Sequence, residues 1–219
     1  MAKINSINNS TGALTVDIAS GDPAVQFSIN TVAKFKIGVD DDDSDKFKIS
    51  SGSALGANDF FIITAAGECT LPLTPSFGAQ NSANDLNVTG DSTTYTIIAD
   101  TEIWDNGSDY NNADGVFTAP VTAKYLLCGN VYLDGLAAGH TTVEFKINGS
   151  NRNILGNGYT SLTSGVQAPT CTNIVSGILD MDASDVASLE IKVSGSTKVV
   201  DVYGSATNFA TSFSGFLLS

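Results

Sequence analysis

Apolar and polar residues alternate with a period of two along most of the chain, and a helical period of 3.6 is almost absent. The alternating runs are short, and Gly, Asp, Pro or Ser turns such as Gly21-Asp22-Pro23 separate them. This pattern predicts an all-β protein. Within residues 1–73 the expected strands are Leu14–Ile18, Val25–Ile29, Phe35–Val39, Phe47–Ile49 and Phe60–Thr64.

Residues 74–219 have the pattern of a complete antiparallel β-sandwich. Asn148-Gly149, Asn157-Gly158 and Ser194-Gly195 are strong turn signals between alternating runs. Eight or more strands at this spacing are typical of a two-sheet jelly roll. Two prolines, Pro72 and Pro75, favour an extended linker at the boundary. The expected strands are Ser76–Ala79, Thr94–Ala99, Gly115–Thr118, Lys124–Leu133, Thr141–Asn148, Cys171–Met181, Ser188–Val193, Lys198–Tyr203 and Phe213–Leu218.

The N-terminal strands are too short to form a stable domain from one copy. A strand of about four residues has two inward side chains, which bury too little area to offset the backbone entropy of ordering. Small isolated sheets are marginal for the same reason. We therefore expect residues 1–73 to form an intertwined homotrimeric β stem, with Phe35 and Phe47 in the shared interface. The alternative is a sheet that packs on the second domain.

The composition excludes several classes of partner. Hydrophobic residues make up 42% of the 219 positions, enough for a packed core, whereas charged residues are only 15%. The formal net charge is −13 with ten Lys and Arg, so nucleic acid and anionic membrane surfaces are unsuitable partners. No apolar run approaches the length of a membrane span.

Three widely spaced cysteines, Cys69, Cys128 and Cys171, do not form a pattern typical of a disulfide framework or a zinc site. Cys128 and Cys171 lie in strand-like runs, where we expect small buried hydrophobic side chains. The sequence after Met1 has no apolar segment of a signal peptide. If Met1 is the natural start, we expect folding in a reducing cytosol and release by a route such as lysis.

Several motifs resemble the complement component 1q-like globular head, a jelly roll of the tumour-necrosis-factor superfamily. The segment Thr74–Ala79 is similar to its opening strand, and Gly115–Val121 followed by Tyr125 is similar to its central signature. The ending Ser212-Phe213-Ser214-Gly215-Phe216-Leu217-Leu218 resembles its last strand. Ala123 stands where the family usually has Gly, and the collagen repeat that often precedes such heads is absent.

The resemblance implies a homotrimer with aromatic residues in its core and subunit interface. We expect this role for Phe117, Tyr125, Phe213 and Phe216, because aromatic side chains bury the largest areas. The stem phrases, such as Phe35–Asp40, resemble those that precede these heads in bacteriophage fibre proteins.

The sequence has no recognisable catalytic motif, and we expect no enzymatic activity. The only histidine, His140, is expected in a surface loop between strands, not beside a nucleophile. Asp180, Asp182 and Asp185 are close in sequence but belong to an expected turn, where acidic residues are ordinary.

The acidic run at residues 40–45 is a candidate cation site. Oxygen-rich loops bind calcium, and three such loops would meet in a trimer. The alternative is a solvated hairpin loop, since Lys46 and Gly52 occupy positions where an EF-hand needs Gly and Glu. The candidate ligands are Asp40, Asp41, Asp42, Asp43 and Asp45.

The head loops are the candidate receptor-binding site. Aromatic rings, amides and carboxylates suit sugars, which stack on rings and form hydrogen bonds to polar groups. Alternatively, these residues are core and turn residues. The candidates are Trp104, Asp105, Asn106, Asp109, Tyr110, Arg152 and Tyr159.

The leading functional hypothesis is a phage tail fibre or spike tip, located in the virion, that adheres to a glycan or protein receptor on a bacterial host. It would bind other virion proteins through its N-terminus. The alternatives are a structural virion component, such as a capsid decoration or head fibre, and a trimeric adhesin on the bacterial cell surface.

Overall fold

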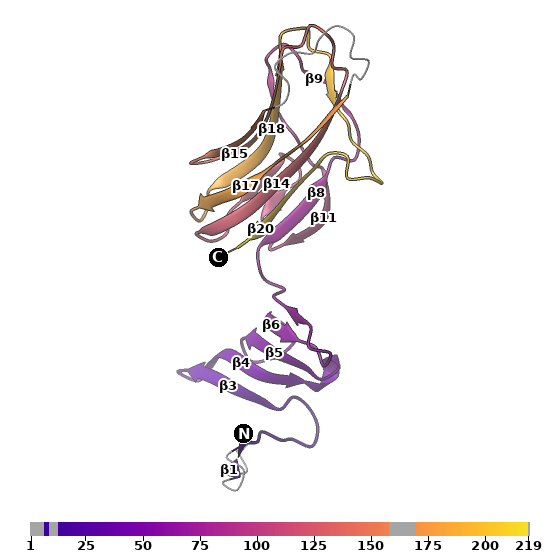
Figure 1. Cartoon of the computed structure of the whole chain (residues 1–219). Coiled ribbons are helices and arrows are strands. Elements are labelled where there is room, and N and C mark those ends of the chain that lie inside the picture. Colours follow the sequence, from indigo (N-terminus) through magenta and orange to yellow (C-terminus); the bar gives the residue numbers. More distant parts are fainter. Residues whose placement is uncertain (1–6, 9–12, 158–169, 219) are drawn as a thin grey trace. The chain divides into compact units, whose positions relative to one another are not determined.

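A computed structural model describes residues 7–8, 13–157 and 170–218 and confirms the all-β fold (Figure 1). Over these residues the only helical element is a three-residue 3₁₀ turn. No helix among the described residues has the length and apolar character needed to cross a membrane. The chain divides into two compact units, residues 1–74 and 75–219, which we call the stem and the head.

The stem contains one antiparallel sheet in which consecutive strands pair in the order β3-β4-β5-β6-β7. The β3–β4 turn has positive φ at both Asn30 and Thr31, as a tight hairpin turn requires. A separate pair, β1–β2, precedes this sheet. The elements are β1 (Ile7–Asn8), β2 (Ala13–Leu14), β3 (Ala24–Ile29), β4 (Val32–Asp40), η1 (Asp41–Asp43), β5 (Lys46–Ser51), β6 (Asp59–Ile63) and β7 (Cys69–Thr70).

Two expectations for the stem need correction. The strand expected at Leu14–Ile18 is wrong beyond Leu14, because residues 15–18 form no strand. The pairing of β3 to β7 is complete within one chain, so strand exchange between chains is not needed to form this sheet.

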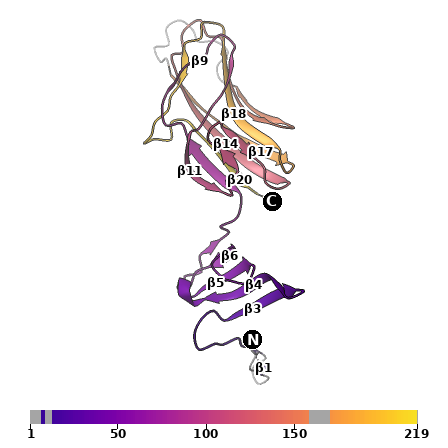
Figure 2. The same ribbon diagram turned by 180° about the vertical axis from the view of Figure 1, so that it is seen from behind.

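The head is a sandwich of two antiparallel sheets, as a jelly roll requires (Figures 1 and 2). Its strands are β8 (Ser76–Gln80), β9 (Asp85–Thr89), β10 (Thr94–Thr96), β11 (Thr101–Asn106), β12 (Tyr110–Asn111), β13 (Val116–Thr118), β14 (Ala123–Asp134), β15 (Thr142–Gly149), β16 (Asn153–Asn157), β17 (Cys171–Met181), β18 (Val186–Ser194), β19 (Val200–Val202) and β20 (Ser212–Leu217).

Strands far apart in the sequence lie side by side in both sheets. The seven-stranded sheet has the order β11-β8-β20-β14-β19-β9, and β17 lies along the free side of β14. The six-stranded sheet has the order β12-β13-β18-β15-β16, and β10 also pairs with β18. The last strand, β20, is thus central, between β8 and β14, which ties both ends of the head into one sheet.

The space between the two sheets is a single aromatic core. Phe77 stacks on Tyr110 and on Phe117 at ring-centroid distances of 4.8 and 4.9 Å, and Phe213 meets Phe77 edge-on at 5.1 Å. Tyr125 packs edge-on against Phe117 at 5.3 Å. Stacked and edge-on pairs of this kind stabilise a core beyond the area that they bury.

The core assignment of Phe117, Tyr125 and Phe213 is therefore confirmed, but these side chains are buried inside one chain and are not available to a subunit interface. Phe216 differs, since it faces outward and is 42% exposed. Of the cysteines, Cys171 is buried as expected, Cys128 is half-buried, and Cys69 is exposed.

Candidate interaction surfaces

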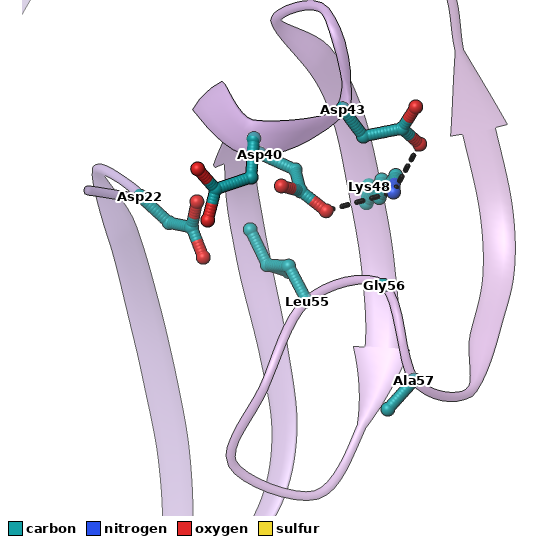
Figure 3. A pocket seen from close by; sticks show the side chains of 8 residues that line it. Asp22, Asp40, Asp43, Lys48, Leu55, Gly56 and Ala57 are labelled. Carbon is teal, nitrogen blue, oxygen red and sulfur yellow. Dashed lines mark hydrogen bonds and ion pairs between the residues drawn. The ribbon is translucent and has the colours of Figure 1, made fainter.

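A buried lysine organises the acidic run of the stem (Figure 3). The Lys48 ammonium donates to Asp40 Oδ2 at 2.8 Å and lies 2.6 Å from Asp43 Oδ2 and 3.5 Å from Asp59 Oδ2. The Lys48 side chain is only 3% exposed. Ser50 adds a hydrogen bond to the second oxygen of Asp59 at 2.5 Å.

The charges in this cluster stabilise one another. Burial alone disfavours the ammonium, but the hydrogen bonds to Asp40 and Asp43 and the charge of Asp59 outweigh burial, so the pKa of Lys48 is raised. The pKa of Asp43 is lowered by hydrogen bonds from Lys46 and then Lys48. Lys48 and Asp43 are therefore both ionised at neutral pH.

Within one chain, this geometry does not form the predicted cation site. Lys48, not a metal ion, lies between the carboxylates of Asp40 and Asp43, and the described residues contain no group of three or more potential ligands arranged to hold a metal. The Asp41 carboxylate instead accepts the Gly21 N–H at 3.1 Å, while Asp42 and Asp45 are exposed.

An open depression of about 530 Å³ lies beside Lys48 (Figure 3). The 3₁₀ turn forms one wall, and the loop that carries Leu55 and Gly56 forms another. Leu55 is buried, so this loop is packed against the polar face of the sheet. The chain thus covers the polar face of the stem sheet with its own loops.

The outward face of the seven-stranded sheet carries an apolar surface. Leu126 on β14 is directly opposite Ile178 on one side and Phe216 on the other, which makes an uncharged row across three strands. Ile178 is 58% exposed, and Ile174, on the same face of β17, is 67% exposed. We call this surface the head face: Trp104, Leu126, Cys128, Ile174, Ile178 and Phe216.

Trp104 lies flat over the head face because Gly78 leaves room for it. A Cβ atom at position 78 would collide with the indole ring, and the ring centroid lies 6.0 Å from that of Phe216. The Trp104 side chain is therefore neither in the core nor free in a loop, the two possibilities considered from sequence. It belongs to the same surface as Phe216.

The loop after Trp104 is held by its own carboxylate. Asp105 accepts hydrogen bonds from the Asp109 and Tyr110 N–H groups at 3.1 and 3.0 Å. Tyr110, a receptor candidate, is only 4% exposed and donates to the Ala99 carbonyl, so its expected role in receptor contact is wrong. Asn106 is half-buried at the end of β11.

Most candidate receptor residues lie at the end of the head where residue 75 joins it, which we call the linker end. Asn106 pairs with Ser76, the first residue of β8, and the Asp109 carbonyl accepts from Thr118, just before the β13–β14 loop. Arg152 is in the β15–β16 turn, which Asn151 joins to Asp185 at 2.7 Å. Tyr159 lies outside the described residues.

His140 organises the opposite end of the head, which we call the far end, and no sequence pattern indicated this role. The Ala137 N–H donates to its Nδ1 at 2.9 Å, and its Nε2 contacts the Thr197 carbonyl at 3.3 Å. His140 is 1% exposed, which corrects the expected surface position, and both ring nitrogens are occupied. It therefore connects the β14–β15 and β18–β19 loops.

Comparison with known proteins gives likenesses of fold. The structure is similar to the globular domain of zebrafish complement 1qA at 15% identity and a TM-score of 0.41, over 66% of this chain and 98% of that one. It is similar to murine APRIL at 11% identity and a TM-score of 0.42, over 66% of this chain and 98% of that one. It is similar to Eiger TNF from S. frugiperda at 11% identity and a TM-score of 0.46, over 67% of this chain and 93% of that one.

No family model matches the sequence, and no curated protein matches it. The solved structures are too distant to transfer a function. The jelly-roll assignment therefore rests on the strand pairing within the head itself.

Proposed function

We propose that the chain forms a homotrimer that acts as the receptor-binding part of a virion fibre or spike, adhering to a glycan or protein on a bacterial cell. The observation that carries this proposal is the head face, with its uncharged row of Phe216, Leu126 and Ile178 across three strands. Side chains this apolar and this exposed mark an interaction surface.

A second copy of the chain is the best partner for the head face. The chain carries a net charge of −13, so identical copies repel one another unless they meet through an uncharged surface. The sequence motifs of the head resemble a family of trimeric heads, and the stem phrases resemble phage fibres. These resemblances support the trimer and the virion location.

Receptor contact is assigned to the far end of the head. The receptor-binding candidates around Asp105 lie at the linker end, and Tyr110 is buried. At the far end, residues 137–139 and Lys198 are exposed on loops that buried His140 holds together. Exposed loops on a rigid sandwich are the usual position of binding residues.

The test measures the mass of the assembly in solution and the binding of the protein to bacterial cells. Light scattering of the full chain should give three times the chain mass, and labelled protein should bind whole cells of a susceptible bacterium. Ala138→Arg should abolish cell binding and leave the trimer intact, because position 138 is exposed at the far end.

The matched control is Ala183→Arg, an exposed substitution in the β17–β18 turn at the linker end, which should bind normally. A monomeric mass would contradict the assembly. Equal cell binding by both variants would contradict the assignment to the far end, and competition by purified surface polysaccharide would distinguish a glycan receptor from a protein.

A further inference from the structure

The stem sheet buries its polar face and exposes its apolar face, the reverse of an ordinary sheet in a monomer. Its polar face is the buried one, with Lys48 2% and Ser50 0% exposed under the chain's own loops. Its other face is apolar and has no second layer within the described part of the stem. Figures 1 and 2 show β3 to β6 as one layer.

The strand register places the apolar residues in continuous rows. Val25, Ile37, Ile49 and Phe61 are direct neighbours across β3, β4, β5 and β6. The neighbouring row begins with Phe27 opposite Phe35. We call the surface made by these six residues the stem face. It carries no charge, because the alternate positions, such as Lys36 and Lys48, point to the other side.

The stem face exposes a continuous apolar area in the single chain. Phe27 is 56% exposed, Phe35 50% and Phe60, which packs against Phe35, 39%. These three rings alone leave about 300 Å² uncovered if a full ring side chain contributes about 200 Å². The aliphatic residues add to this, so the patch reaches the size of about 300–600 Å² at which the largest apolar patch of a soluble protein is often an interaction site.

We propose that the stem face packs against the same face of two further copies of this chain, around a shared axis. The number three rests on the proposed function, in which the head is trimeric. Further copies are the fitting occupants because they present an equally uncharged face at equal concentration. Their acidic residues, such as Asp40 and Asp43, lie on the other side of the sheet.

The width of the stem sheet agrees with three-fold packing. Five strands about 4.8 Å apart span about 19 Å, and the centre of a triangle with sides of that length is about 5.5 Å from each side. Sheets that pack face to face are about 10 Å apart, so a side-chain layer fills about 5 Å. Three stem faces therefore meet at the axis without leaving a channel.

The decisive test compares two neighbouring residues of β3 in the full chain. Val25→Cys reports the stem face and Gln26→Cys the opposite face, each with Cys69→Ser to remove the exposed thiol. Both positions are exposed in the single chain. In the assembled stem, maleimide should label Cys at 25 roughly tenfold or more slowly than Cys at 26, because labelling would require opening of the trimer.

Light scattering on the same samples separates the possible outcomes. A trimer with protection at position 25 supports the inference. A trimer in which both positions react equally overturns it and leaves the proposed function standing, whereas a monomer overturns both. A dimer with protection at position 25 overturns the three-fold arrangement.

A second variant tests the energetic role of the stem face without opening any core. Phe27→Asp should lower the temperature at which the trimer dissociates in detergent, while Ser28→Asp, on the other face of the same strand, should leave it unchanged. Equal dissociation temperatures for the two variants would overturn the inference.

Discussion

At the scale of single residues, glycines decide where large side chains lie. Gly215 faces the core, and a Cβ atom there would come within 2.5 Å of the Phe77 ring and 2.7 Å of Leu127. Gly78 has the same function on the outward side of the sheet, under Trp104. Gly215 therefore leaves room for the Phe77 ring in the core.

Gly215→Ala should destabilise the head by about 1–3 kcal/mol, because an added methyl group overpacks the Phe77 contact. Ser214→Ala is the control, since Ser214 faces outward and should change stability little. Urea unfolding followed by near-UV circular dichroism measures both. Equal midpoints for the two variants would contradict the overpacking argument.

Asp109 is the second residue with a measurable effect. Its Oδ2 is buried and has no hydrogen-bond partner among the described residues, and burial, followed by the charge of Asp105, raises the pKa of Asp109. A raised carboxyl pKa means that the folded state binds the proton more tightly than the unfolded chain. The ionised carboxylate therefore destabilises the head at neutral pH.

Asp109→Asn should stabilise the head by less than about 1 kcal/mol at pH 7, because it removes a charge whose buried Oδ2 has no partner among the described residues, while solvent screens the rest of this partly exposed side chain. The advantage should shrink as the pH falls through the raised pKa of Asp109, where the wild-type carboxyl becomes neutral. Unfolding curves of both proteins between pH 7 and pH 4 measure this difference. An advantage that does not depend on pH would contradict the electrostatic cause.

At the scale of elements, the β4–β5 hairpin of the stem depends on an ion cluster. Lys48→Met should destabilise the stem by about 3–5 kcal/mol, because it leaves the buried Asp40 carboxylate without its cation. Lys46→Met is the control and should cost less than about 1 kcal/mol, since Lys46 pairs with the partly exposed Asp43. Limited proteolysis within residues 41–58 reports the loss.

The same cluster predicts how the stem responds to acid. Since the pKa of Asp43 is lowered by Lys46 and Lys48, its contribution is present above its unfolded-state pKa of about 4 and is lost as the pH falls through the lowered value. The raised pKa of Lys48 keeps its charge through neutral and mildly alkaline pH. Hydrogen exchange of β4 and β5 should therefore be constant from pH 6 to 9, after correction for intrinsic rates, and accelerate below pH 4.

At the scale of the whole molecule, the two apolar faces should contribute separately to assembly. Ile178→Asp on the head face should weaken the proposed trimer, because it would bring three carboxylates into the proposed apolar interface. Thr142→Asp, exposed on the six-stranded sheet, is the control. Residues 75–219 alone should fold and should dissociate at a lower temperature than the full chain. Sedimentation velocity measures each variant, and an unchanged trimer in Ile178→Asp would contradict the interface.

The sequence by itself determined the strand content and much of the core. Period-two alternation and turn residues specify strands locally, so the all-β class and the buried positions of Phe117, Tyr125 and Phe213 were predictable. The number and spacing of strands and the motif resemblance both indicated a jelly-roll head, which the strand pairing bears out.

Only the tertiary structure decided which groups meet. The acidic run was a candidate cation site in sequence, but strand register places Lys48 among its carboxylates. His140 was expected at the surface, but the packing of two loops buries it. Tyr110 was expected in a surface loop, but its ring is buried and stacks on Phe77. These outcomes depend on contacts between distant residues, and a local pattern of hydrophobic and polar positions does not encode which distant residue becomes the neighbour.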